Sequence, residues 1–359
     1  MYNFKQYLTM GGNVVLGDES ASRIDLLKFD RSEIVPILYD ALKSINRAFE
    51  RDTGLSMWSD SLIASKKFLS GSAFHFFDLT GIEDKKFSTV KKTVGDLDTK
   101  VPEALAPFIK KWLDTRQGST YGDLTLIGYK ESIGQFITLW KSKALDQNIQ
   151  IDLEQLPFTD GLPTTWAEFS HSSEWEDLEQ GLKGVSHKYL LRALNAKDLK
   201  DVMVRMKSGK EKTITSAETA FSASGMRQKL EPIMGPHGQE IKNGLPVYRE
   251  LPTSETGFNT DLDDIFINYF GHAPSNTEKK QMWSFTGLID LIKKHFDRSI
   301  LIKVADGFAN TLWGPGAQSL YRADPEKDLE EKTVMMDYMC QHFGLPVDRW
   351  NNIKRSFYQ

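Results

Sequence analysis

Three closely spaced segments with strand patterns constrain the fold more than any other feature of the chain. They are DLTLIGYK (123–130), QFITLWKS (135–142) and NIQIDLEQL (148–156), and a short ESIG connector joins the first two as in a hairpin. Apolar and polar residues alternate in them, which is typical of half-buried strands. Strands that follow one another directly predict an α+β fold rather than repeated βαβ units.

Helical patterns come before these strands. The segment RSEIVPILYDALKSINRAFERDTG carries apolar residues at helical spacing, with Pro36 tolerated in the first turn and Gly54 as the expected C-cap. The apolar positions are Ile34, Ile37, Leu38, Leu42, Ile45 and Phe49. A second helix is expected from Pro102 to about Gly118, and short helices at residues 2–8 and 58–68.

The length of 359 residues suggests two domains. Residues 1–160 predict an α+β domain with a mixed β-sheet flanked by helices. Residues 161–359 predict a mainly helical domain with a short β pair near 200–214. Gly- and Pro-rich residues 228–258 predict an excursion, and Lys-rich residues 78–92 predict a loop or insertion.

Bulk properties narrow the class of protein. The net charge of −4 argues against a general polyanion binder, so any nucleic-acid contact needs a local basic face. Cys340 is the only cysteine, which rules out an internal disulfide and disfavours a cysteine-based zinc site. No apolar run is long enough for a signal peptide or a membrane span. We therefore expect a soluble, cytoplasmic protein with no membrane partner.

The stretch KKTVGDLDTKVP places two acids one residue apart in a strand pattern. Side chains at i and i+2 of a strand share a face, so Asp96 and Asp98 point the same way while Leu97 packs on the other side. Two partly buried carboxylates so close repel each other. A bound divalent cation relieves this repulsion, and Mg²⁺ prefers such oxygen ligands.

A third acid strengthens the interpretation. In NIQIDLEQL, Asp152 alternates with apolar residues and lies on the polar face of its strand. If this strand lies beside the GDLD strand, three carboxylates can hold two metal ions for an in-line displacement at phosphorus. Glu154 shares the face of Asp152 and is the alternative third ligand, although we favour Asp152.

Further residues are candidates for phosphate binding. Gly71 permits close backbone approach, and a free N–H with the Ser72 hydroxyl can hold phosphate oxygens. Lys188 opens a helix from which it can reach a triphosphate, with a solvated lysine as the default. Arg227 is a weaker candidate for a phosphate clamp, and His171 a weaker candidate for catalysis. The pairs at residues 66–67, 85–86 and 91–92 are lysines that can guide a polyanion.

Together these motifs resemble a known family. A helix, a Gly-Ser pair, a strand with Asp-x-Asp and a later strand with a third Asp resemble the nucleotidyltransferase superfamily typified by DNA polymerase β, over roughly residues 30–156. The residues that carry the resemblance are Gly71, Ser72, Asp96, Asp98 and Asp152. TVGDLDTKVP and HSSEWEDLEQGLKGVSHKYLL are also similar to predicted nucleotidyltransferases of large tailed bacteriophages.

The resemblance implies a transferase that moves a nucleoside monophosphate from an NTP, such as ATP, to an acceptor hydroxyl and releases pyrophosphate. It implies that Asp96, Asp98 and Asp152 hold two Mg²⁺ or Mn²⁺ ions, with Asp152 assisting deprotonation of the acceptor. It also implies that Gly71 and Ser72 hold the nucleotide phosphates. The acceptor stays open between a nucleic-acid end, a protein and a small molecule, and a phage-encoded protein is expected in the host cytoplasm.

The chain departs from the family in one respect. The family places Asp-x-Asp shortly after Gly-Ser, whereas residues 73–94 intervene here. Either a segment is inserted, which we favour, or Gly71-Ser72 is an ordinary turn. Two other classes stay open. The first is a catalytically silent nucleotide-binding module, and the second is a phage structural or host-interaction protein whose acids bind a stabilising cation.

Overall fold

A computed structural model of the chain describes residues 15–16, 19–132, 134–156, 165–170, 174–182, 186–222, 225–317 and 325–358. The chain forms two compact units. The first contains Met1–Gly161 and His171–Gly184, and the second contains Leu162–Ser170 and Val185–Gln359. The chain therefore enters the second unit at Leu162, returns to the first at His171, and stays in the second from Val185 onward. The expected helix at residues 2–8 and His171 lie outside the described residues.

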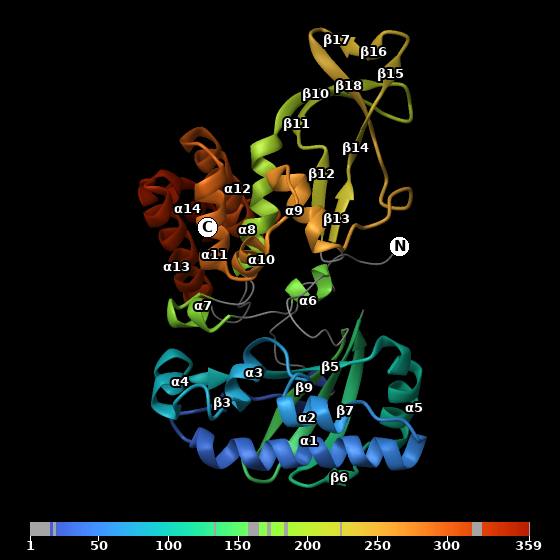
Figure 1. Ribbon diagram of the computed structural model, residues 1–359, viewed down its shortest axis with the longest axis vertical. Coiled ribbons are helices and arrows are strands. Elements are labelled where there is room, and N and C mark those ends of the chain that lie inside the picture. Colours follow the sequence, from blue (N-terminus) through green and yellow to red (C-terminus); the bar gives the residue numbers. More distant parts are fainter. Residues whose placement is uncertain are drawn as a thin grey trace. The chain divides into compact units, whose positions relative to one another are not determined.

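A five-stranded mixed sheet forms the centre of the first unit (Figure 1). Its order is β5-β9-β8-β7-β6, with β5 parallel to β9 and the other pairs antiparallel. The strands are β5 (Asp96–Val101), β6 (Thr120–Tyr121), β7 (Leu124–Ser132), β8 (Gln135–Ser142) and β9 (Gln147–Gln155). The three strand segments predicted from the sequence are β7, β8 and β9, which confirms the α+β class.

One long helix, α1 (Arg31–Thr53), packs against one face of this sheet. It begins at Asp30, whose side chain accepts from the Ser32 N–H at 2.8 Å, and ends at Gly54 with φ 73°. Its buried residues belong to the same core as Leu97, Ile151 and Leu153 of the sheet. Among its predicted apolar positions only Ile37 is exposed. Because side chains alternate along a strand, the acids between these apolar residues face away from α1.

The segment between Gly-Ser and Asp-x-Asp forms two short helices, α3 (Gly71–Phe77) and α4 (Asp84–Val90). For residues 78–92, predicted as a loop or insertion, the loop alternative is wrong in part, because α4 makes residues 84–90 helical. Phe87 is fully buried, so this otherwise polar helix packs against the core through its side chain. The guanidinium carbon of Arg31 lies 4.5 Å from the centroid of the Phe87 ring.

From the first turn of α1, Arg31 holds in place the segment that contains α3 and α4. Its side chain is buried and donates to the backbone carbonyls of His75, Phe76, Asp78 and Ile82 at 2.7–2.8 Å, and to the Asp84 carboxylate at 3.0 Å. The guanidinium thus binds a group of carbonyls around the end of α3, two of which, those of His75 and Asp78, also accept from backbone N–H groups. Loss of this side chain would remove these charge-assisted hydrogen bonds from a buried segment.

The remaining elements of the first unit are short. The strands β1 (Val15–Leu16) and β2 (Glu19–Ser20) form a hairpin, and β3 (Ile24–Asp25) pairs with β4 (Thr93–Val94). The helices are α2 (Asp60–Ser65), α5 (Ala106–Arg116), which follows a 3₁₀ turn at Glu103–Leu105, and α7 (Trp175–Glu179). Helix α7 joins this unit because Trp175 stacks on Phe87, with ring centroids 5.7 Å apart, and Glu179 pairs with Lys86.

A second five-stranded sheet lies in the second unit, where only a β pair at 200–214 was predicted. Its order is β11-β10-β18-β14, and β17 also pairs with β18. These strands are β10 (Lys200–Arg205), β11 (Glu211–Ser216), β14 (Leu230–Pro232), β17 (Ile241–Lys242) and β18 (Leu245–Glu250). Smaller pairs are β12 (Thr219–Ser222) with β13 (Gly225–Gln228), and β15 (Met234–Gly235) with β16 (Gly238–Gln239).

Residues 228–258, predicted as an excursion, supply three of the sheet's five strands, which the sequence analysis did not predict. One of their glycines, Gly244, lies in a turn. The Asn243-Gly244 turn, with φ 53° and 75°, connects β17 to β18, and both values suit a tight hairpin turn.

The rest of the second unit is helical, as predicted. The helices are α6 (Trp166–Ser170), α8 (Ser186–Ala193), α9 (Leu262–Phe270), α10 (Asn276–Met282), α11 (Phe285–His295), α12 (Arg298–Trp313), α13 (Pro325–Phe343) and α14 (Asn351–Tyr358). Single 3₁₀ turns cover Leu194–Asp198 and Val347–Trp350. The sequence patterns did not single out α12. Among the described residues, no helix is long and apolar enough to cross a membrane.

Candidate active site

The acidic strands lie side by side. In the parallel pairing of β5 with β9, Asp98 is opposite Asp152, and Asp96 is opposite Gln150. The i and i+2 rule places Asp96 and Asp98 on one face of β5, and the register brings Asp152 to the same face of β9. Carboxylate oxygens of the three residues lie within 4.8 Å of one another. The structure thus brings together the three predicted aspartates.

The three aspartate side chains are partly or fully shielded from solvent, and all three are acidic. Asp152 is buried, whereas Asp96 and Asp98 are half-buried. Burial, then Asp96, Glu154 and Asp152, raise the pKa of Asp98 well above its usual value, although the Lys91 charge opposes this. Burial, Asp96 and Glu154 likewise raise the pKa of Asp152. Such repulsion is what a divalent cation relieves, and the all-oxygen donor set fits Mg²⁺ or Mn²⁺.

Neighbouring side chains fix the orientation of Asp152. The Gln150 amide donates to both carboxylate oxygens of Asp152, at 3.0 and 3.1 Å. On the opposite face of the sheet, the Thr99 hydroxyl donates to the Asp152 carbonyl at 2.9 Å and ties β5 to β9. Gln150 was not singled out from the sequence, although its position two residues before Asp152 on the same strand face was a readable signal.

Glu154, the alternative third ligand, has a different role in the structure. Its carboxylate accepts from the Ser70 hydroxyl at 2.6 Å, and it lies outside the group of three whose oxygens converge. It is close enough to raise the pKa of Asp98 and Asp152. Glu154 therefore adds to the negative field of the site and links it to the residue before Gly71.

Gly71 and Ser72 begin α3 directly beside β5. The Ser70 N–H donates to the Asp98 carbonyl at 3.0 Å, and Leu69 bridges to Thr99. Gly71 has φ 51°, a left-handed conformation that disfavours side chains. The pair thus lies next to the aspartates in space despite the long intervening sequence, which forms α3 and α4 instead of separating them. Its role in phosphate binding stays a prediction.

Two further predicted residues lie in the second unit. Lys188 belongs to α8, and its phosphate contact stays a prediction. Its neighbour His187 is fully buried with Nε2 2.8 Å from the Phe169 carbonyl oxygen, and burial lowers its pKa to about 3. His187 is therefore a neutral structural residue. Arg227 donates to the carbonyl of Leu251, which indicates a structural contact.

Comparisons with known proteins give little further guidance. No protein-family model matches the chain, and no curated protein matches it. One solved structure, that of the "putative nucleotidyltransferase from H. pylori", is similar at 9% identity over 84% of this chain and 98% of that chain. The TM-score of 0.20 is too low to establish a common fold.

Proposed function

We propose that the protein is a metal-dependent nucleotidyltransferase that moves an NMP from an NTP to an acceptor hydroxyl and releases pyrophosphate. The observation that carries the proposal is the convergence of Asp96, Asp98 and Asp152 from two parallel neighbouring strands. Three carboxylates share one face, and burial together with the neighbouring acids raises the pKa of Asp98 and Asp152, which supports binding of divalent metal ions.

Each residue has a definite task in this proposal. Asp96, Asp98 and Asp152 would hold two Mg²⁺ or Mn²⁺ ions, which when bound supply charge neutralisation at the transferring phosphate. Asp152 would take the proton of the acceptor hydroxyl, in an orientation held by the Gln150 amide. Gly71 and Ser72 would hold triphosphate oxygens beside β5, and Lys188 would be a further lysine that binds the nucleotide. The fold would accordingly be of the nucleotidyltransferase type.

The acceptor class follows less directly. With a formal net charge of −4, the chain offers no general attraction for a long polyanion. Nearby positive charge is local, as in the Lys91 side chain that acts on Asp98. We propose a protein side chain or a small molecule as acceptor ahead of a long nucleic acid, with a bacteriophage origin as the context that the sequence resemblance suggests.

The test is a transfer assay with the full-length chain. Each labelled NTP is incubated with Mg²⁺ or Mn²⁺, and label transfer and pyrophosphate release are measured for the wild type and for Asp96→Asn/Asp98→Asn. The matched control is Asp40→Asn/Asp146→Asn, which removes two exposed aspartates of the same unit. Turnover in the wild type and the control, lost in the site variant, supports the proposal.

Other outcomes assign the remaining classes. An NTP that raises the melting temperature of the wild type without turnover indicates a nucleotide-binding module, since a ligand stabilises the state that binds it. Neither turnover nor stabilisation with any NTP contradicts the proposal and favours a structural or host-interaction protein.

A further inference from the structure

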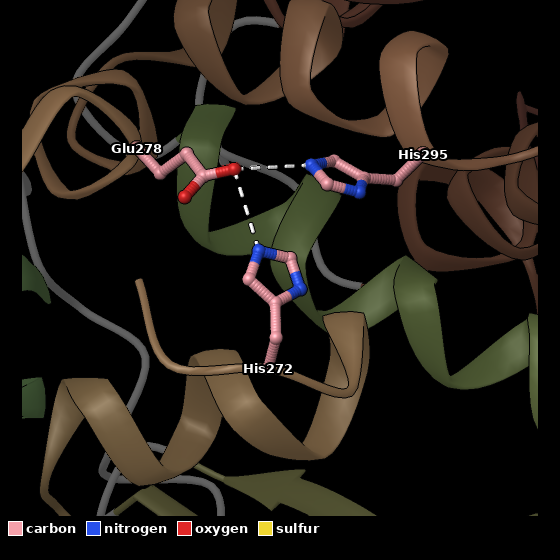
Figure 2. A group of neighbouring side chains, drawn as sticks. All are labelled: His272, Glu278 and His295. Atoms are coloured by element: carbon pink, nitrogen blue, oxygen red, sulfur yellow. Dashed lines mark hydrogen bonds and ion pairs between the residues drawn. The ribbon is translucent and has the colours of Figure 1, made fainter. Parts of the chain in front are cut away.

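A second group of side chains with metal-ligand chemistry lies in the second unit. His272 follows the C-cap of α9, Glu278 lies in the first turn of α10, and His295 ends α11. One ligand atom from each lies within 4.8 Å of the others. Figure 2 shows both imidazole rings directed at the same carboxylate oxygen. Nothing in the proposed nucleotidyl transfer uses these residues.

The distances suit a small metal ion. Oε1 of Glu278 lies 3.4 Å from Nε2 of His272 and 3.2 Å from Nε2 of His295. Zn–N and Zn–O bonds of about 2.0–2.2 Å in a tetrahedron place neighbouring ligand atoms roughly 3.4 Å apart. The spacing of the carboxylate from each ring is thus already that of two edges of a tetrahedral site.

The tautomer of His272 points the same way. Its Nδ1 lies 3.1 Å from the Phe270 carbonyl, which can only accept, so Nδ1 carries the hydrogen. In the neutral ring Nε2 then presents a lone pair, and this lone pair faces the carboxylate oxygen of Glu278. A backbone carbonyl that holds the other ring nitrogen is also the usual support of a metal-bound histidine.

The surrounding residues hold the three groups in place. The other oxygen of Glu278, Oε2, accepts from the Ser275 N–H at 3.0 Å and from the Ser275 hydroxyl at 2.8 Å, in a capping box. The His272 ring packs edge-on against Phe266, and the His295 ring packs edge-on against Phe270, each with centroids 5.3 Å apart. This leaves Oε1 and the two Nε2 atoms as the available ligands.

We propose that His272, Glu278 and His295 bind one transition-metal ion of the Zn²⁺ class. Two imidazole nitrogens and one carboxylate oxygen favour Zn²⁺ or Co²⁺ over Mg²⁺. Three protein ligands leave one tetrahedral position open, and the His272 side chain is 42% exposed to solvent. Lys294, with Nζ 3.4 Å from Oε1, competes with the ion for the carboxylate. A bound ion would join the ends of α9, α10 and α11.

The experiment is a titration of the metal-free, full-length chain with Co²⁺ in excess Mg²⁺, which shields the aspartate site. We expect one Co²⁺ per chain, the visible absorption of tetrahedral Co²⁺, and its loss when Zn²⁺ displaces the ion. His295→Ala should weaken binding by more than about 100-fold, because even changes behind the ligands cost 10–100-fold. His237→Ala removes an exposed histidine elsewhere and should bind as the wild type does.

Two further variants keep the test decisive if His295→Ala fails to fold. Glu278→Gln retains an acceptor for Ser275 and the capping box, yet should bind Co²⁺ much more weakly. Lys294→Ala removes the competing ammonium and should bind more tightly than the wild type. Absence of tetrahedral absorption in the wild type overturns the proposal. So does unchanged affinity in Glu278→Gln, or in Lys294→Ala.

Discussion

The two candidate metal sites of this protein use carboxylates in opposite ways. On strands β5 and β9, three aspartates face one another, and their repulsion and burial raise the pKa of Asp98 and Asp152. At the helix ends of the second unit, Glu278 accepts hydrogen bonds from the Ser275 N–H and hydroxyl. These two hydrogen bonds are the main reason that its pKa lies well below the usual value. The first site is strained without a cation, whereas the second is already compensated.

This difference indicates which of the two sites is the better candidate for catalysis. A cluster that destabilises the folded chain unless it binds something is typical of a functional site, because the structure tolerates the cost for the sake of activity. A carboxylate that caps a helix contributes to stability with or without a metal. The aspartate site is therefore the better candidate for catalysis, and the histidine site for joining helices.

The largest expected effect concerns catalysis. Asp98→Asn keeps the shape of the side chain but removes one charged metal ligand, so NMP transfer should fall by at least about 1,000-fold, equivalent to several kcal/mol. Initial rates at saturating NTP and Mg²⁺ measure this. A residual rate within tenfold, roughly 1.4 kcal/mol, would contradict a direct role for Asp98.

The next largest effect is on the stability of the segment with α3 and α4, which packs beside the aspartate site. Arg31→Met should destabilise the protein by about 3–5 kcal/mol, since it leaves buried carbonyls and Asp84 without their donor. Urea unfolding measures the loss. Arg51→Met on the same helix removes an exposed arginine and should change stability by less than about 0.5 kcal/mol. Equal losses in the two variants would show that Arg31 does not anchor the segment with α3 and α4.

In metal-free protein, the same Asp98→Asn change should increase the stability of the folded state, whereas Arg31→Met decreases it. The effect should be smaller than that of Arg31→Met. A carboxyl whose folded pKa is raised favours folding in its neutral form. Its contribution is full below the pKa of an unfolded aspartate and is lost as pH rises through the folded value. The variant should thus be more stable than the wild type at neutral pH, by about 1 kcal/mol, and equal to it in acid. Melting curves across pH in a chelator test this. A variant less stable at neutral pH would refute the repulsion.

The smallest effect is expected at Glu278, with the reverse pH dependence. Its folded pKa is lowered, so the stability it gives is present above the pKa of an unfolded glutamate and is lost as pH falls through the folded value. Metal-free Glu278→Gln should melt slightly below the wild type at neutral pH, and the difference should vanish in strong acid. If Glu278→Gln melts at a higher temperature than the wild type at neutral pH, then Glu278 does not stabilise the fold, and the two sites do not differ as described.

Much of the fold could be predicted from local sequence. Helix α1 has its cap at Asp30, its apolar face and its terminal Gly54 within one segment, so short-range patterns determined it. The same holds for β7, β8 and β9.

Predictions failed where tertiary contacts decided the structure. Residues 228–258 look like an excursion because of their glycines and prolines, and the pairing of β18 with three other strands was not predicted. The Asn243-Gly244 hairpin turn was a local signal that could have been used.

The sequence by itself determined which acids share a strand face, because alternation along a strand is a local property of the backbone. Only the tertiary structure decided that β5 and β9 are parallel neighbours with Asp98 opposite Asp152, since that pairing joins residues far apart in the chain. It also decided that His272, Glu278 and His295 meet. Their spacing follows no local period, and three helix ends must pack together before their side chains can share one point.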